Sequence, residues 1–164
     1  MPTSLRRLLV TVACVALVGA GATMAVATTE GGSEGNSAET QYGPAQGCTP
    51  GFWKNHTSVA VWGTEYSPSD TFDSVFGVTK FGSKTLLEVL DLGGGGYNAL
   101  ARHAVAALLS SSNPDVNYGL SPEEVIKMVQ DAISGKDPET TKDVFEPLNE
   151  AGCGVDAHGN PIDD

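Results

Sequence analysis

Two histidines, His56 and His103, are the side chains of the central chain best suited to bind a metal ion. Imidazole nitrogens are good ligands for zinc and copper, and a carboxylate such as Asp70, Asp73 or Glu88 would supply a third donor. The sequence has no HExxH or HxH motif and no cysteine cluster, so spacing alone does not define a site. The alternative is that both imidazoles are structural, each buried and satisfied by a hydrogen bond. A metal-binding or metal-dependent enzyme domain is therefore one hypothesis.

A second group of candidates begins in the stretch GCTPGFWKNH, residues 47–56. Trp53 is suited to anchor a sugar ring or a peptide, and Lys54 and Asn55 place hydrogen-bond donors beside it. Arg102 stands among Ala, Leu and Val residues and would complete, with Lys54, a clamp for an anion or carboxylate. The structural alternatives are that Trp53 packs inward, that Asn55 holds a loop, and that Arg102 forms an ion pair or caps carbonyls. These four residues are our candidate ligand-binding set.

No pattern that we recognise in the sequence indicates a catalytic centre. The run Gly93–Gly96 precedes a helical segment, but no GK[ST] follows it, so a nucleotide-binding loop is not supported. A pair of acids with readable geometry is also missing. We therefore name no catalytic residue and no cofactor, except for zinc or copper under the metal hypothesis.

Cysteine positions predict how the domain is closed. Cys14 lies in an apolar N-terminal segment, which leaves Cys48 and Cys153 at the two ends of the central region. Two cysteines in an oxidising compartment are expected to pair. The bridge would close a loop of about 105 residues and would contribute about 4 to 5 kcal/mol in the chain-entropy description. Metal ligation and an intermolecular bridge are the alternatives.

The N-terminus is typical of an exported protein. Arg6 and Arg7 precede an apolar stretch, and Ala25-Val26-Ala27 fits a cleavage site, so residues 1–27 read as a signal peptide. The alternative is an uncleaved membrane anchor, because the apolar stretch is about long enough to span a bilayer. Either reading predicts a secreted, extracellular or cell-surface protein.

Composition divides the remaining chain into three further parts. Residues 28–46 are rich in Gly, Ser, Thr and Glu and read as a disordered linker. Residues 47–153 suffice for one small domain, and residues 154–164 read as a flexible tail.

The charge of the chain limits its partners. Twenty acidic and nine basic residues give a formal charge of −11, which becomes −13 when the two N-terminal arginines leave with the signal peptide. Such a chain repels nucleic acid and anionic lipid. We expect an extracellular protein or glycan as partner, no nucleic acid, and membrane contact only through an uncleaved N-terminal segment.

Helix signals dominate the central region, and no segment alternates over more than a few residues. Ser121-Pro122 with Glu124 is the best helix start, and the helix near residue 85 is capped by Ser83 or by a Thr85/Glu88 box. Pro147 should kink or restart the last helix. The expected helices cover residues 50–60, 83–90, 97–109, 121–135 and 139–151, and residues 67–77 are expected to form a turn and a short helix that ends at Gly77. The fold class is therefore all-α: a single small domain of five or six helices, closed by one disulfide and preceded by the signal peptide and linker.

Three stretches carry a resemblance to a known family: GCTPGFWKNH, NALARHAVAALL at 98–109 and LNEAGC at 148–153. Together they resemble an uncharacterised family of secreted bacterial and archaeal proteins whose motifs read GCTPG[FY]WKNH and ARHAVAALL. The resemblance covers residues 47–153 and implies a secreted or surface module without implying an activity. The sequence thus favours a secreted or surface-tethered, non-catalytic interaction module of unknown ligand, with the metal-binding domain as the alternative.

Overall fold

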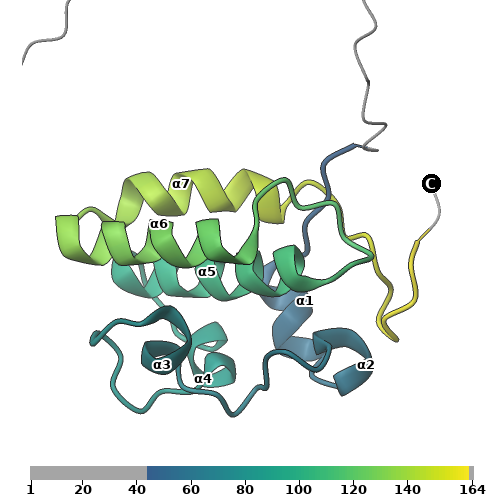
Figure 1. The fold of residues 1–164 in the computed structure, drawn as a ribbon, viewed down its shortest axis with the longest axis horizontal. Helices are drawn as coiled ribbons and strands as arrows, with labels where there is room; N and C mark the ends of the chain where they lie inside the picture. The colour runs from purple at the N-terminus through teal and green to yellow at the C-terminus, as the bar shows by residue number, and fades with distance from the viewer. Residues whose placement is uncertain (1–43, 163–164) are drawn as a thin grey trace, which may run out of the picture. The chain divides into compact units, whose positions relative to one another are not determined.

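The structure is a computed structural model that describes residues 44–162. Within this part of the chain the backbone forms seven helices and three isolated β-bridges (Figure 1). The helices are α1 (Pro50–Asn55), α2 (Val59–Trp62), α3 (Phe72–Phe76), α4 (Leu86–Leu90), α5 (Tyr97–Ser112), α6 (Pro122–Gly135) and α7 (Pro138–Asn149). The predicted helical class is confirmed, whereas the expected signal peptide and most of the expected linker lie outside the described residues.

Helix α5 is the centre of the hydrophobic core. Ten of its residues are buried, as expected for a helix that is apolar on nearly all sides. Helices α6 and α7 pack along one side of α5, and α1 and α4 along the other, while α3 contacts α6 (Figure 1). Large buried side chains from several helices fill the space between these layers, among them Trp53, Phe72, Phe76 and Phe145.

Helix starts follow the predicted capping chemistry. Ser121 and Glu124 form a complete capping box at α6, with Pro122 in the first turn. Of the two caps considered for α4, the structure has the Thr85/Glu88 box. Pro147 lies inside α7, which nevertheless continues to Asn149.

The structure has more helices than the five or six expected, because the predicted helix over 50–60 is broken into α1 and α2. The Asn55 side chain donates to the Gly51 carbonyl at 2.9 Å, and the backbone N–H of His56 closes α1 onto the Phe52 carbonyl. Ser58 then takes an extended conformation and begins α2. These local bonds give hydrogen-bond partners to carbonyl groups of α1, so the helix can end there and α2 can begin as a separate helix.

The two ends of the helical region meet at the disulfide between Cys48 and Cys153, which confirms the predicted pairing. A β-bridge continues the contact, with the Gly47 N–H donating to the Gly152 carbonyl at 2.7 Å. The chain preceding the bridge is also attached, since the Gln46 N–H donates to the Asn117 carbonyl at 2.8 Å.

Residues 154–162 differ from the flexible tail expected there. Val155 is buried in the core and forms a β-bridge with Pro161. The turn between them packs against α2 so closely that a Cβ atom on Gly159 would lie 2.1 Å from the Ala60 carbonyl oxygen. Sequence composition missed this packing because Val155 is the single buried apolar residue of a polar segment.

Among residues 44–162, no helix has the length and apolar character that crossing a membrane requires.

Candidate binding surface

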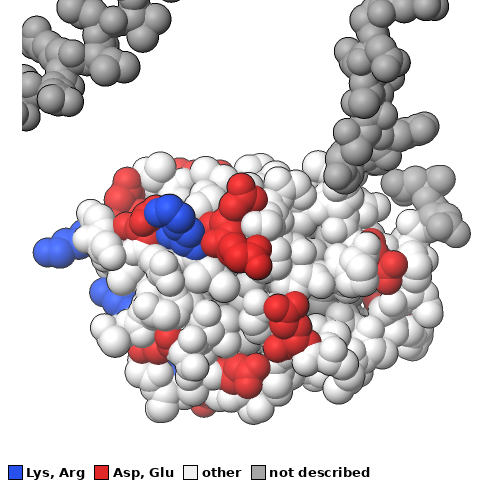
Figure 2. Space-filling model, in the orientation of Figure 1, with Lys and Arg blue, Asp and Glu red and all other residues white. Residues whose placement is uncertain are grey.

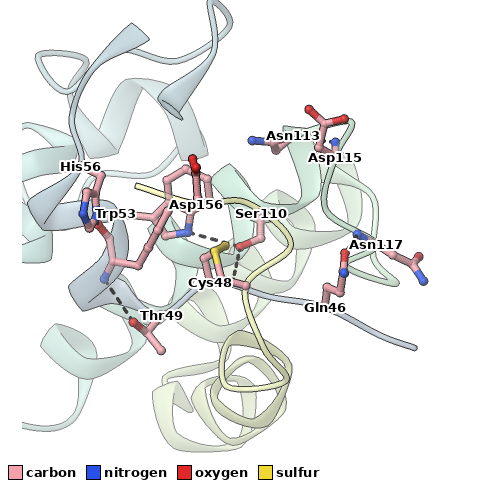
Figure 3. Close-up of a disulfide and its surroundings, with 12 residues drawn as sticks. Gln46, Cys48, Thr49, Trp53, His56, Ser110, Asn113, Asp115, Asn117 and Asp156 are labelled. Carbon is pink, nitrogen blue, oxygen red and sulfur yellow. Dashed lines mark hydrogen bonds between the residues drawn. A yellow bond between two sulfur atoms is a disulfide. The ribbon is translucent and has the colours of Figure 1, made fainter. Parts of the chain in front are cut away.

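Trp53 lies inside the protein and holds the domain together. Its side chain is fully buried, and its indole N–H donates to the Ser110 hydroxyl oxygen at 3.3 Å. The backbone N–H of Cys48 donates to the same oxygen at 3.1 Å (Figure 3). Trp62 adds a third link by donating its indole N–H to the Trp53 carbonyl at 3.0 Å. We call these four residues the Ser110 network.

The Ser110 network gives Trp53, the tryptophan of the GCTPGFWKNH stretch, a structural role. It ties the disulfide, α1, α2 and α5 together through a hydroxyl that is itself fully buried. Trp53 therefore cannot serve as the exposed anchor for a sugar or peptide in this structure, and the inward alternative is the correct one. The sequence offered one signal for Ser110: a polar residue directly after an apolar helical run.

Lys54 and Asn55 are exposed, but each is engaged by a neighbour. Lys54 forms an ion pair with Asp91, and this ammonium lowers the pKa of the Asp91 carboxyl below its usual value. Asn55 uses its amide to close α1. The structure therefore does not assemble these side chains with Trp53 into one surface.

Arg102 stabilises the glycine-rich loop that precedes its own helix. Its guanidinium donates to the carbonyls of Leu92 at 2.7 Å and Gly94 at 3.0 Å. The same loop is held by Asn98, which donates to the Gly93 carbonyl, and by Glu139, which accepts from the Gly96 N–H. Of the two structural alternatives for Arg102, an ion pair or carbonyl partners, the structure has carbonyl partners.

The two candidate metal ligands lie in different surroundings. His56 Nδ1 lies 2.8 Å from the Phe52 carbonyl oxygen at the end of α1, and the imidazole packs on the Phe52 ring. His103 is in the middle of α5, with its Nε2 atom 3.9 Å from a carboxylate oxygen of Glu146 on α7. In residues 44–162, no group of three or more His, Cys, Asp or Glu side chains is placed to hold a metal ion.

His103 belongs to a polar group between α5, α7 and the loop before α6. Asn149 is fully buried; its amide donates to the His103 carbonyl at 3.0 Å and it accepts from the Tyr118 hydroxyl at 2.8 Å. Burial lowers the pKa of the His103 imidazole, an effect that the Glu146 carboxylate opposes. Burial likewise raises the pKa of Tyr118. This arrangement fixes helix packing with neutral groups.

A concave apolar surface lies instead at α2. A cavity of about 260 Å³ is lined by Thr57, Val59, Trp62, Gly63, Thr64, Tyr66, Ser67 and Pro68. We call it the α2 groove. Val59 is 68% exposed, more than the other two exposed large apolar residues of the described chain. An exposed apolar side chain of this kind has no polar groups that must give up water when a partner covers it. This makes the surface around Val59 favourable for contact.

A second depression, of about 360 Å³, lies beside the α2 groove and shares Trp62, Gly63 and Thr64 with it. Glu65 and Asp115 belong to its lining, and we call it the acidic depression. A further cavity, of about 650 Å³, is lined mainly by residues 116–121 and by Ala45 near the start of the described chain. It has no exposed large apolar side chain and offers a less favourable contact surface.

Tyr66 lines the α2 groove, and nearby carboxylates affect the pKa of its hydroxyl. Partial burial and the nearby carboxylates of Glu65 and Glu123 raise the pKa of its hydroxyl, against a hydrogen bond with Ser112 that lowers it. Figure 2 shows acidic side chains spread over the visible face, whereas the blue basic side chains lie in the left half of the view, away from α2. The carboxylates of Glu65 and Asp115 therefore lie next to the apolar surface at α2.

Comparison of the chain with protein-family models, with curated proteins and with solved structures finds no match. The family resemblance of the three sequence stretches remains a prediction.

Sequence reasoning did not select Val59, Trp62, Tyr66 or Pro68. The available signal was local: the apolar residue Val59 is followed within nine residues by Trp, Tyr and Pro. These types are enriched at recognition surfaces, but the same pattern also fits an ordinary core segment.

Proposed function

We propose that this protein is an extracellular, non-catalytic binding module that contacts its partner through the α2 groove. The N-terminal segment would export the domain and, if retained, tether it to the cell surface. The partner would be an extracellular protein or glycan, as the sequence led us to expect.

The observation that carries the proposal is the α2 groove itself. Val59 exposes most of its side chain beside the aromatic residues Trp62 and Tyr66, in a concavity whose rim carries hydroxyl groups from Thr57 and Ser67. Apolar walls with a few polar groups at the rim are typical of ligand-binding clefts. Burying Val59 on a partner would contribute about 1 to 2 kcal/mol.

Two further features support this assignment. The disulfide fits a non-reducing compartment, which agrees with the export signal predicted from the sequence. The polar residues that we first considered for chemistry, among them Lys54 and Arg102, are engaged in bonds that hold helices and loops in place. Their positions support a structural role rather than catalysis.

A binding screen with matched valine variants tests the proposal. The full exported protein, with its disulfide formed, would be applied to glycan arrays, cell-wall polysaccharides and immobilised synthetic peptides. Val59→Ser removes apolar surface from the groove, while Val144→Ser makes the same change at an exposed position of α7. We expect Val59→Ser to weaken binding about fivefold and Val144→Ser to leave it unchanged.

Equal binding by wild type and Val59→Ser would exclude the α2 groove as the contact surface. Trp53→Ala is not a useful probe, because it would open a cavity in the core instead of changing a surface.

A further inference from the structure

The α2 groove and the acidic depression offer different chemistry on the two sides of one short segment. The segment Trp62–Thr64 lines both. On one side the lining is apolar and aromatic, with Val59, Trp62, Tyr66 and Pro68. On the other side it includes the carboxylates of Glu65 and Asp115, both of which are exposed. A ligand lying across Gly63 would therefore meet apolar surface first and negative charge next.

The negative charge beside the groove is not neutralised by the residues that form it. Among residues 44–162, no Lys, Arg or His lines either depression. Glu123, at the start of α6, adds a third carboxylate close enough to act on the Tyr66 hydroxyl. The two carboxylates of the acidic depression thus lie at one edge of the apolar surface, and a cation placed there would gain from both.

Resting on the binding function proposed above, we propose that the partner is an extracellular protein segment that presents an apolar side chain next to a lysine or arginine. The apolar side chain lies in the α2 groove against Val59. The basic side chain reaches the acidic depression at Glu65 and Asp115. Charge complementarity then fixes the direction in which the segment crosses Gly63.

Charge complementarity favours this partner over a glycan. A neutral sugar would contact the groove but would gain nothing from the carboxylates, and an acidic polysaccharide would be repelled by them. The chain as a whole carries a formal charge of −11, which attracts basic segments from a distance and accelerates their encounter.

A synthetic peptide array provides the test. The full exported protein is applied to immobilised 15-residue peptides in which a central Leu, Phe, Pro or Ser is followed by Lys, Arg, Glu or Ser. We expect the strongest binding where an apolar residue precedes Lys or Arg, and about tenfold weaker binding when Glu replaces the basic residue. The double variant Glu65→Gln/Asp115→Asn should bind the basic peptides about fivefold more weakly at low salt. Because salt screens exposed charges, that difference should shrink at about 0.5 M salt.

Asp131→Asn is the matched control, because it also removes a carboxylate but lies on α6, outside both depressions. Asp131 forms an exposed ion pair with Lys127, so its loss should change folding little. Binding of the basic peptides by this variant should equal that of wild type.

Three results would overturn the peptide assignment. Preferential binding of a neutral oligosaccharide, or of peptides with Glu in the second position, would show that the partner class is wrong. A loss in Asp131→Asn of half that in the double variant or more would show that only net charge acts, because Asp131→Asn removes one carboxylate and the double variant removes two. If Val59→Ser still weakens the binding that is seen, the function proposed for the α2 groove stands in all three cases. If Val59→Ser has no effect, both proposals fall.

Discussion

Replacement of Ser110 by alanine tests the bonding that holds both ends of the domain to α5. The Ser110 hydroxyl is fully buried and accepts hydrogen bonds from the Cys48 backbone at 3.1 Å and from the Trp53 indole at 3.3 Å. Ser110→Ala removes one oxygen atom and leaves the shape of the helix nearly unchanged. The two N–H groups would remain buried, because the Cys48 and Trp53 side chains are themselves fully covered.

The expected cost follows from those two donors. A buried donor without a partner costs about 1 to 3 kcal/mol. The longer of the two bonds is near the upper end of the normal distance range and is expected to be the weaker one. We therefore expect the loss of both bonds to cost about 3 kcal/mol. Alanine is the better helix former by about 0.5 kcal/mol, which offsets part of the loss. We expect the free energy of unfolding to fall by about 2 to 3 kcal/mol, a large share of what a domain of this size has.

Urea unfolding of the oxidised protein measures this change. Trp53 and Trp62 are both buried, so their emission reports on unfolding. Ser111→Ala is the control: Ser111 is the neighbouring residue, is partly exposed, and donates to the Leu108 carbonyl within its own helix. Its replacement should change stability by less than about 0.5 kcal/mol.

A double-mutant cycle isolates the indole bond. In a Trp53→Phe background the indole N–H is already absent, so Ser110→Ala leaves only the Cys48 N–H without a partner. The free energy of unfolding should then fall by about 1 kcal/mol less than it does when Ser110→Ala is made in wild type. Equal effects of Ser110→Ala and Ser111→Ala, or an additive cycle, would refute the assignment of Ser110 as the shared acceptor.

Three further predictions concern the disulfide, the buried histidine and the packed turn. Replacing Cys48 and Cys153 together by alanine should lower the free energy of unfolding by about 4 to 5 kcal/mol, measured by urea titration, because the bridge closes a sequence separation of 105 residues. The pKa of His103 is lowered by burial, so the stability that its neutral form provides is complete above about pH 6.5 and is lost as the pH falls below that value. Wild type should therefore lose more stability than His103→Gln between pH 7 and pH 5 in parallel thermal melts, and equal pH dependence would contradict this reasoning. Gly159→Ala should destabilise the protein by about 1 to 3 kcal/mol, because φ is +85° and the new Cβ would collide with the Ala60 carbonyl oxygen; faster amide exchange at Val61 would report the displaced turn.

Much of the fold could be predicted because its signals are local. The Ser121/Glu124 box and the apolar run of α5 are each contained within a short stretch, and the two cysteines outside the N-terminal segment leave one pairing. The break between α1 and α2 was harder to predict. It depends on the Asn55 side chain bonding to its own helix, which competes with helix continuation without changing the hydrophobic pattern.

The direction of the Trp53 side chain could not be predicted, because its partner is remote. Ser110 is 57 residues away in sequence, and nothing in the neighbourhood of Trp53 indicates a buried acceptor. A six-residue helix makes fewer than two turns, so its apolar stripe is too short to separate an inner from an outer face. The sequence therefore grouped Trp53 with Lys54 and Asn55 on one surface, whereas the structure buries Trp53 in the core.

The α2 groove and the closure of the domain depend on the same contacts. Trp62 lines the groove and also donates its indole N–H to the Trp53 carbonyl, so the position of the groove wall is set from within the Ser110 network. On the far side of α2, the turn at Gly159 packs on Ala60, and this turn follows Cys153 directly in the chain. The disulfide thus fixes two segments that approach α2 from opposite ends of the sequence. A four-residue helix has little stability of its own. Its ability to present Val59 in one place therefore comes from closing the chain, so the one structural bridge would also support the binding surface that we propose at α2.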